Sequence, residues 1–443
     1  MSATLTHGRP VPLPRTLPDA GAYTDSSDPF LFRRFRTWWL LIALFLMAQG
    51  NGILNRQDDR YWSLKRVSHL TQSSPVYLLL TVTLWLMCAS LIFGHLRPAL
   101  QMMVRQRVVL AFAVLALIST LWSQDPNLTF RKATLLFLTF LFAWFFATYY
   151  SPADQMRILI AAGVVVALAS CAMAILLPQY GIASTGEWKG VFGQKNRLGL
   201  GIFFLFSALP FCSLSSYRKR ISLALQALLP VGLILLSQSR TSLIMALVLV
   251  AIRIIGPLIA RARRDQLPFM WYSVVSGTLF VGLAISLGSS LLLTTLGRDA
   301  TLSGRTEHWP LLLSFAFRHL WLGYGYEAFW TGTGDSLTVI RSVGALMRGA
   351  DSGYMDTMLQ FGLTGIGLLL VLLLLRIRDF ARLLRRPTVP LIAYWYLGVI
   401  LATFVGSYTE ILFLTSNGII TFIFVIACAG LTRLQQPEAW VRS

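Results

Sequence analysis

Six basic side chains stand in polar gaps of an otherwise strongly apolar sequence. They are Lys195, Arg197, Arg240, Arg305, Arg341 and Arg348. A guanidinium stays charged at any relevant pH and donates paired hydrogen bonds to phosphate oxygens. Several of these groups converging at one membrane surface could bind a lipid diphosphate and stabilise the charge of a departing phosphate. The alternative is that Arg240 and Arg305 pair with acidic residues or reach lipid headgroups.

Aromatic residues surround these cations, and no metal ligands accompany them. Trp309, Trp321, Trp330, Tyr324 and Tyr326 form either an interfacial aromatic belt or a surface on which sugar rings stack. No carboxylate pair or histidine cluster has metal-ligand spacing, so we expect neither a metal nor a cofactor.

The elements that carry these residues are long apolar runs. Hydrophobic residues make up 56% of the chain and charged residues 13%, which excludes an ordinary soluble globular protein. Each run is long enough to cross a bilayer, and lipid favours helices because it satisfies no backbone groups. We therefore predict an all-α polytopic membrane protein with about twelve transmembrane helices. The runs are residues 37–54, 76–94, 108–123, 133–150, 157–177, 198–213, 221–237, 241–258, 269–292, 355–376, 390–406 and 412–431.

The net charge of +20 does not indicate nucleic acid, because basic clusters occupy every second short gap. Under the positive-inside rule this pattern puts both termini in the cytoplasm. The six cations of the opening set then face outward, against the trend. The clusters that we expect to face inward are residues 33–36, 97–107, 218–220, 261–264 and 376–386.

This topology divides the chain into five segments. Residues 1–36 form a cytoplasmic tail, 37–292 the first nine helices, and 293–354 a long outer loop. Residues 355–431 form the last three helices, and 432–443 a second cytoplasmic tail. Within the loop, the apolar stretch 308–321 is expected to form an amphipathic interfacial helix that starts at Pro310 and ends before Gly323.

Four polar motifs occur in order in the outer gaps: GVFGQKNRLG, SQSRTS, SGRTEHW with LGYGYEAFW, and DSGYMDTMLQFGLTG. Their combination resembles the O-antigen ligase and polymerase superfamily, and within it the exopolysaccharide polymerases of the ExoQ type. The resemblance covers about residues 121–431. It implies a GT-C-like glycosyltransferase, metal-independent and inverting, whose donor and acceptor are undecaprenyl-diphosphate-linked glycans at the periplasmic face of the inner membrane.

The resemblance also implies roles for individual residues. Lys195 and Asn196 match a Lys-Asn pair, Arg240 the arginine of an S-x-S-R turn, and Arg305 that of a G-R-x-x-x-W motif. Tyr354 and Asp356 match the start of the following helix. Two departures stand out: Gln194 replaces a common histidine, and Asp351 with Ser352 replaces the pattern that carries the ligases' catalytic histidine. The second departure favours a polymerase.

The mechanism that follows uses Arg240 and Arg305 against the diphosphate, with Lys195, Arg341 or Arg348 assisting. A general base must accept the proton of the attacking sugar hydroxyl. Asp351 is the first choice among Glu307, His308, Asp351 and Glu410. Glu410 could instead only orient an arginine, and His308 could be a membrane-surface anchor beside Trp309.

Two other functions remain open from the sequence. The first is an O-antigen ligase that transfers a finished glycan to lipid A core. The second is a flippase for lipid-linked oligosaccharides, which should carry its charges at mid-membrane depth and show repeated halves. A copolymerase that regulates chain length is an expected partner of a polymerase, and no nucleic-acid partner is expected.

Overall fold

The computed structural model describes residues 30–49, 75–93, 95–212, 217–261, 308–331, 334–343, 349–386 and 388–435. Within these ranges the chain is helical and has no strand beyond one isolated antiparallel bridge, Ile182 to Trp188, so the predicted all-α class is confirmed there. The long helices are α1 (Phe30–Gln49), α3 (Pro75–Ile92), α5 (Arg107–Ile118), α6 (Pro126–Tyr149), α7 (Pro152–Leu176), α9 (Lys195–Phe206), α10 (Tyr217–Ser237), α11 (Arg240–Arg261), α15 (Gly353–Leu383), α16 (Leu391–Gly406) and α17 (Ile419–Gln435). The shorter ones are α4 (Leu96–Arg105), α8 (Pro178–Gly181), α13 (Trp309–Arg318) and α14 (Gly334–Val343).

Eleven of the twelve apolar runs that the sequence marks overlap one of the long helices, and the run 269–292 lies outside the described residues. By length and composition, four described helices can cross a bilayer: α6, α7, the stretch Arg240–Leu258 of α11, and α15. There are five if α3 and α4 together form one span. Several shorter apolar helices accompany them, among them α16 and α17. The number of twelve transmembrane helices therefore stays a prediction.

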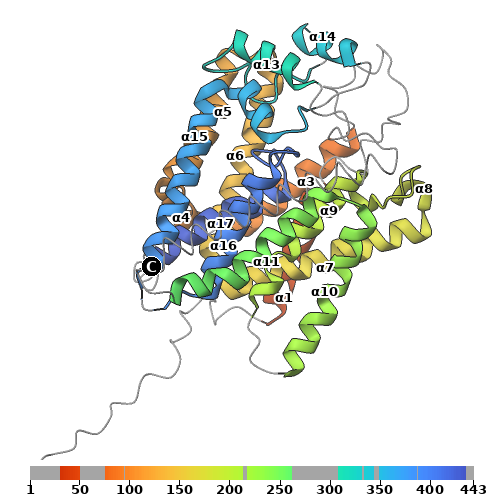
Figure 1. The fold of residues 1–443 in the computed structure, drawn as a ribbon, viewed down its shortest axis with the longest axis vertical. Coiled ribbons are helices and arrows are strands. Elements are labelled where there is room, and N and C mark those ends of the chain that lie inside the picture. Colours follow the sequence, from red (N-terminus) through yellow and green to blue (C-terminus); the bar gives the residue numbers. More distant parts are fainter. Residues whose placement is uncertain are drawn as a thin grey trace, which may run out of the picture.

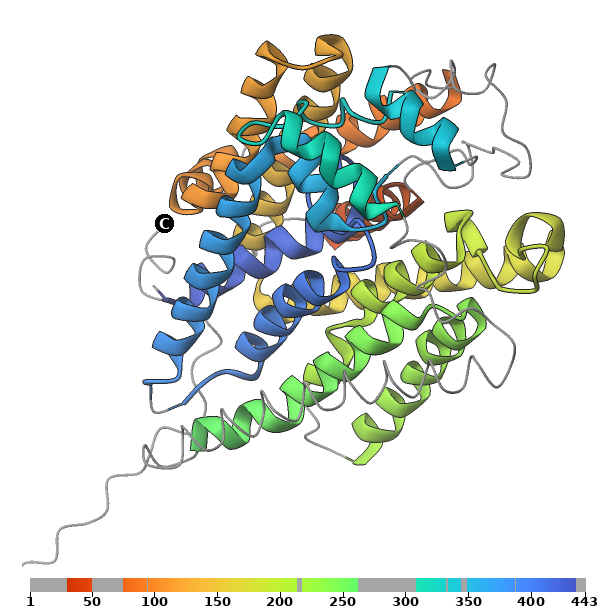
Figure 2. The same cartoon turned by 45° about the horizontal axis from the view of Figure 1, so that its top comes forward.

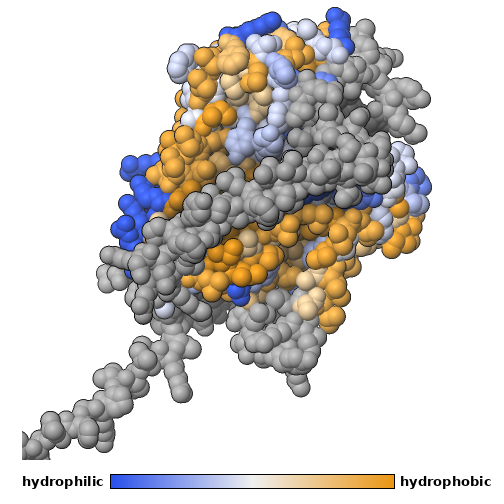
Figure 3. Space-filling model, viewed as in Figure 1, coloured by the Kyte–Doolittle hydropathy of each residue, from blue (hydrophilic) through white to orange (hydrophobic). Residues whose placement is uncertain are grey.

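Large apolar side chains on the outside of the helices indicate a lipid environment. Leu79, Leu86, Leu228, Leu247 and Leu374 are each more than half exposed. Apolar residues cover much of the visible flank of the molecule, while hydrophilic residues gather at its upper end and at its left edge (Figure 3). Water-soluble proteins rarely show apolar surface of this extent. The chain is therefore a multi-pass membrane protein.

The core is built where α16 and α17 lie between two groups of helices, α7 with α9–α11 and α4–α6 with α15 (Figures 1 and 2). Aromatic side chains fill it, and Trp144, Trp395 and Tyr396 are almost fully buried. Trp395 and Tyr396 have partners for their polar atoms, whereas Trp144 Nε1 has none among the described residues. Trp395 Nε1 donates to Ser207 Oγ at 2.9 Å, and the Tyr396 hydroxyl donates to Gln155 Oε1 at 2.9 Å. Satisfied aromatic groups of this kind fix one packing of the helices.

Helix α15 is broken at Gly362, whose φ of 61° and ψ of −153° suit glycine only. The turn 320–325 docks against the break and completes its hydrogen bonds. Leu363 N donates to Leu320 O at 2.7 Å and Thr364 N to Trp321 O at 3.2 Å, while Tyr324 N donates to Leu359 O at 2.8 Å. Irregular backbone at membrane depth persists only when protein satisfies it in this way. The LGYGY motif is thus part of the fold of α15.

Hydrogen bonds between some of the described gap segments agree with the grouping that the sequence predicts, and which group faces outward stays a prediction. Segments expected to face outward meet one another: Gln124 N donates to Tyr324 O, and Trp188 N to Leu236 O. Segments expected to face inward meet at the other end, where Arg433 Nη1 donates to Tyr150 O at 2.9 Å. Helix α13 and the C-terminal end of α15 lie at opposite ends of the bundle in Figure 1. We call these the outer and the inner end.

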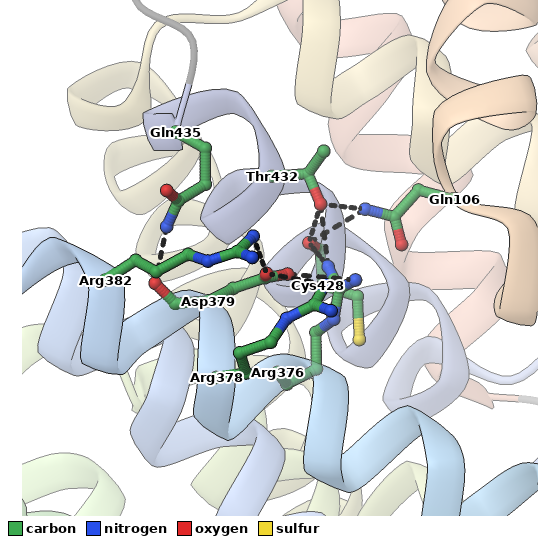
Figure 4. A network of polar contacts seen from close by, with 8 residues as sticks. All are labelled: Gln106, Arg376, Arg378, Asp379, Arg382, Cys428, Thr432 and Gln435. Carbon is green, nitrogen blue, oxygen red and sulfur yellow. Dashed lines mark hydrogen bonds and ion pairs between the residues drawn. The ribbon is translucent and has the colours of Figure 1, made fainter.

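A buried polar network closes the inner end (Figure 4). Arg376 and Asp379 on α15 are each 6% exposed, and Arg376 Nη2 lies 3.1 Å from Asp379 Oδ2. Arg376 Nη1 also donates to Cys428 O at 3.0 Å and to Thr432 Oγ1 at 2.7 Å on α17. The amide of Gln106 reaches the same carbonyl at 3.0 Å. The network fastens α5, α15 and α17 together.

Candidate functional site

The site is organised by the turn between α16 and α17, residues 406–411, which we call the junction turn. Asn196 Nδ2, in the first turn of α9, donates to Glu410 Oε1 at 2.7 Å. Thr241, in the first turn of α11, lies 2.9 Å from Thr409 through their hydroxyl oxygens. Gly353 N, at the start of α15, donates to Ser407 O at 2.7 Å and to Glu410 O at 3.1 Å. Segments more than 200 residues apart therefore meet at one place.

Four helix N-termini consequently converge on the junction turn. Besides α9, α11 and α15, helix α13 begins there, because the Trp309 ring packs edge-on against Tyr408 with centroids 5.5 Å apart. The N-terminus of a helix presents free backbone N–H groups and the positive end of its dipole. Such ends bind anions. The arrangement gives the outer end a positive field that is independent of the arginines.

Close backbone packing makes this convergence possible. A Cβ on Gly199 would lie 2.7 Å from Ser239 Cβ and 2.7 Å from Ser242 Oγ, so only glycine lets α9 approach the turn between α10 and α11. That turn is the SQSRTS motif, and Gln238 in it has a φ of 51°. The GQKNRLG and SQSRTS motifs are thus in direct contact.

Arg240 is the first residue of α11 and is exposed. It adjoins Thr241, which contacts the junction turn. Within the residues that the structure describes, no carboxylate pairs with Arg240. The structural alternative for this residue, an ion pair with an acidic partner, therefore has no support there.

The other predicted cations differ in their surroundings. Lys195 Nζ lies 2.8 Å from Glu187 Oε1, an acid that the sequence analysis did not single out. The hydrogen bond from Lys195, together with one from Thr185, lowers the pKa of Glu187 to about 2. Arg197 is exposed in the first turn of α9. Arg341 is exposed in the last turn of α14, which packs against α13.

Three predicted site residues, Arg305, Glu307 and Arg348, lie outside the described residues. His308 directly follows Glu307 in the chain, is partly exposed and precedes α13. This helix runs from Trp309 to Arg318, so it begins one residue before the predicted start at Pro310 and ends earlier than predicted. Trp309 Nε1 donates to Ala350 O at 3.3 Å, which ties α13 to the turn before α15.

Asp351 stands in that turn with a φ of 51°, and it is partly exposed. Non-glycine residues in this left-handed region are uncommon and concentrate at functional positions, although aspartate tolerates it. Neighbouring groups leave the turn little freedom. A Cβ on Gly349 would lie 2.2 Å from Ile411 Cδ1, and Gly353 is bonded to the junction turn. Asp351 and Glu410 are therefore held by the same piece of structure.

Two predicted substrate contacts have structural partners instead. Tyr326 is fully buried and stacks on Phe361 with centroids 5.8 Å apart, and its hydroxyl donates to the Leu414 carbonyl. A sugar cannot reach this ring, so the sugar-stacking interpretation is corrected for Tyr326. The Tyr354 hydroxyl donates to Phe404 O at 2.6 Å, which joins α15 to α16.

The remaining aromatic residues divide between packing and surface. Tyr324 is also buried, and Trp330 Nε1 donates to Asp356 Oδ1 at 2.8 Å. Trp321, by contrast, is 69% exposed at the outer end, as an interfacial aromatic belt requires. Of these three rings one is buried, one is partly buried and one is exposed, which explains why spacing alone did not separate the two interpretations.

Glu410 contacts Asn196, and the alternative that it orients an arginine stays a prediction. In the sequence, Asn196 and Glu410 both lie in gaps predicted to face outward, just before the predicted helices 198–213 and 412–431. This shared position could have linked them. No group of three or more histidine, cysteine, aspartate or glutamate side chains gathers in the described part of the chain. What gathers is a set of cations, helix N-termini and single carboxylates, suited to an anionic substrate and proton transfer.

Fold and site define a multi-pass helical membrane protein in which four helix N-termini meet at one turn, with the exposed Arg240 at one of them. The O-antigen ligase family profile matches residues 225–370, a range that includes Arg240, Arg305 and Asp351. The exopolysaccharide production protein ExoQ of Rhizobium meliloti (strain 1021) is 27% identical over 341 residues, covering 73% of this chain and 76% of the relative. These matches confirm the resemblance to the O-antigen ligase and ExoQ-like family. They support a glycosyltransferase-like function of the O-antigen ligase or polymerase type.

Proposed function

We propose that this protein is a polysaccharide polymerase of the bacterial inner membrane. It joins oligosaccharide repeat units carried on undecaprenyl diphosphate, at the periplasmic face, for exopolysaccharide or O-antigen synthesis. The similarity to an exopolysaccharide production protein supports the product class. Asp351 and Ser352, standing where the ligases resembled by this chain have their histidine pattern, support polymerisation over ligation.

The observation that carries the proposal is the convergence of four helix N-termini on the junction turn, with Arg240 at one of them. Each N-terminus is equivalent to about half a positive charge. Several such ends with an exposed guanidinium suit a diphosphate, which carries more than one negative charge. Arg305 precedes α13 by four residues in the chain and is the proposed second arginine.

In the proposed reaction a hydroxyl oxygen of the acceptor repeat unit attacks the anomeric carbon of the donor glycan. The bond between that carbon and the diphosphate oxygen breaks, and its electron pair leaves with the diphosphate. Arg240 and Arg305 stabilise the charge that develops on the departing oxygen. The hydroxyl proton passes to the carboxylate of Asp351. Attack from the opposite face inverts the anomeric centre, and no metal takes part.

The flanking residues have supporting roles in this proposal. Lys195 is neutralised in part by Glu187, so it serves as a hydrogen-bond donor more than as a free charge. Arg197, Arg341 and Arg348 contribute to the positive field. Glu307, His308 and Trp309 line the route to the acceptor, and a copolymerase regulates chain length.

Replacement of Arg240 tests the proposal. Arg240→Ala removes one donor to the leaving group, and loss of one such donor lowers turnover by about 10²- to 10³-fold in other enzymes. A deletion strain complemented with this variant should accumulate single repeat units and little high-molecular-weight polymer, at normal protein levels in the membrane. Arg378→Ala is the matched control, since Arg378 is half exposed at the inner end. Wild-type chain lengths with Arg240→Ala would contradict the phosphate-binding role.

The second candidate is an O-antigen ligase, which the description of the matching family favours. It would use the same site to transfer a finished glycan to lipid A core. The deletion strain separates the two, because loss of a polymerase leaves single repeats whereas loss of a ligase leaves full-length chains on the carrier lipid.

A further inference from the structure

Asp356, in the first turn of α15, is a buried carboxylate that binds three separate groups. It is 5% exposed. Its Oδ1 accepts hydrogen bonds from Trp330 Nε1 at 2.8 Å and from the backbone N–H of Ala350 at 3.2 Å. Its Oδ2 accepts a bond from Gln360 Nε2 at 2.9 Å. No cation pairs with Asp356 in the described ranges.

Burial of a carboxylate without a cation destabilises the folded protein, since hydrogen bonds from neutral donors replace only part of its hydration. The contrast with Asp379, at the other end of the same helix, makes this plain. Asp379 is equally buried but pairs with Arg376 (Figure 4). Packing alone would be served as well by an apolar side chain at position 356. The retained charge therefore indicates a task that its acceptor oxygens perform.

The three bonds hold together the parts that surround Asp351. Ala350 directly precedes Asp351, whose backbone has the uncommon φ of 51°. Trp330 belongs to the segment that follows the docked turn 320–325, so its bond fixes the outer loop to the start of α15. Without an acceptor for Ala350 N–H, a buried donor would be left unpaired and the turn would relax.

We infer that Asp356 is a positioning residue, whose carboxylate holds the turn 350–352, and with it Asp351, against the outer loop at Trp330. The inference rests on the proposed function, because Asp351 needs a fixed position only if it is the general base. What Asp356 supplies is geometry, through acceptor oxygens, and it exchanges no proton with substrate.

An asparagine can take over this task, which gives a sharp test. In Asp356→Asn the side-chain oxygen still accepts from Trp330 and Ala350. Its new amide N–H faces Gln360, whose own amide can rotate to present oxygen. In Asp356→Leu, of similar shape, both acceptor oxygens are lost and with them all three hydrogen bonds. A positioning role therefore predicts that the first variant works and the second does not.

Two measurements on the full-length protein decide the matter. Hydrogen exchange of the purified protein in detergent, followed in peptides that contain Ala350, reports the bond directly. The deletion strain complemented with each variant reports the chain length of the polymer. With Asp356→Asn both should match the wild type. With Asp356→Leu the Ala350 amide should exchange at least about tenfold faster, while α17 stays protected and the strain accumulates single repeats.

Asp379→Asn is the matched control, because it alters an equally buried carboxylate of α15 and should leave exchange at Ala350 unchanged. If Asp356→Leu proves unfolded, Trp330→Phe replaces it. That variant removes one donor to Oδ1, keeps a ring in place and should raise Ala350 exchange and shorten the polymer.

Three results would overturn the inference: wild-type exchange at Ala350 in Asp356→Leu, wild-type chain lengths in that variant, or loss of polymer in Asp356→Asn with Ala350 still protected. The last would assign the effect to charge. A ligase phenotype of the deletion strain would overturn the proposed function alone, because hydrogen exchange at Ala350 would still test whether Asp356 holds the turn 350–352.

Discussion

The hydrogen bond between Asn196 and Glu410 joins α9 to the junction turn, and substitutions can exchange its donor and its acceptor. At 2.7 Å it is a short hydrogen bond to a charged acceptor. Such bonds contribute about 1.5–3 kcal/mol, and each 1.4 kcal/mol is a factor of ten in an equilibrium. If the bond holds the two segments in the active arrangement, Glu410→Ala should lower the rate of polymer formation by about 10- to 100-fold. Glu410→Gln keeps an acceptor oxygen and should lose only a few-fold.

Exchanging donor and acceptor makes the test specific. Asn196→Asp sets two carboxylates against each other and should be as harmful as Glu410→Ala, because like charges at this distance repel. Combining Asn196→Asp with Glu410→Gln restores one donor and one carboxylate acceptor in reverse order. The double variant should therefore recover most of the activity lost by Asn196→Asp alone, a coupling of at least about 1 kcal/mol.

The assay is the early rate at which long polymer appears in the complemented deletion strain, with single repeats on the carrier lipid measured in parallel. Membrane levels of each variant are determined by blotting. Rescue by the double variant would establish the contact as a positioning bond. If Glu410→Gln were as inactive as Glu410→Ala and the double variant gave no rescue, the charge of Glu410 would be what matters, and Glu410 would replace Asp351 as the candidate base.

Two further predictions concern stability. Gly362→Ala should destabilise the protein by at least about 3 kcal/mol, because φ is positive there and the new Cβ would lie 2.4 Å from a backbone carbonyl oxygen. Gly367→Ala on the same helix is the control, because its Cβ meets open space and the substitution should be neutral or stabilising. Thermal melting in detergent compares the two variants. The pKa of Glu187, lowered to about 2 mainly by the hydrogen bond from Lys195, lies below its unfolded value of about 4.3. The ion pair therefore contributes stability that is complete above about pH 5 and lost as the pH falls toward 2, and Glu187→Gln should flatten this part of the melting-temperature profile.

The apolar runs predicted the elements well because in a membrane protein hydrophobicity alone selects helices. The helix starting at Trp309 was also predictable, from Pro310 and the apolar run behind it. Helix α4 was not, because it is short and lies in a basic gap that the sequence assigns to a loop. The break in α15 was equally hidden, since Gly362 lies inside the predicted run 355–376, as other glycines do, and its strain appears only in the backbone angles.

Tyr326 shows where sequence reasoning about a site failed. The local sequence around a tyrosine near glycines in an outer loop is the same whether the ring faces a sugar or packs against a helix. The turn 320–325 completes the hydrogen bonds of the broken α15, and this carries Tyr326 into the core. Only the partner surface, which lies elsewhere in the chain, decides between the two.

The sequence by itself determined the helical class, because apolar length is a local property, and it predicts the sidedness of the gaps and the set of cations on the outer side from the placement of charge. The tertiary structure decided which of these residues meet. It brought Asn196 to Glu410, Thr241 to Thr409 and Gly353 to Ser407 across long stretches of chain. It also paired Lys195 with Glu187 and gave Asp356 its three donors. The physical reason is that hydrogen bonds between distant segments depend on how helices pack, and packing is not written in the spacing of residues along one helix.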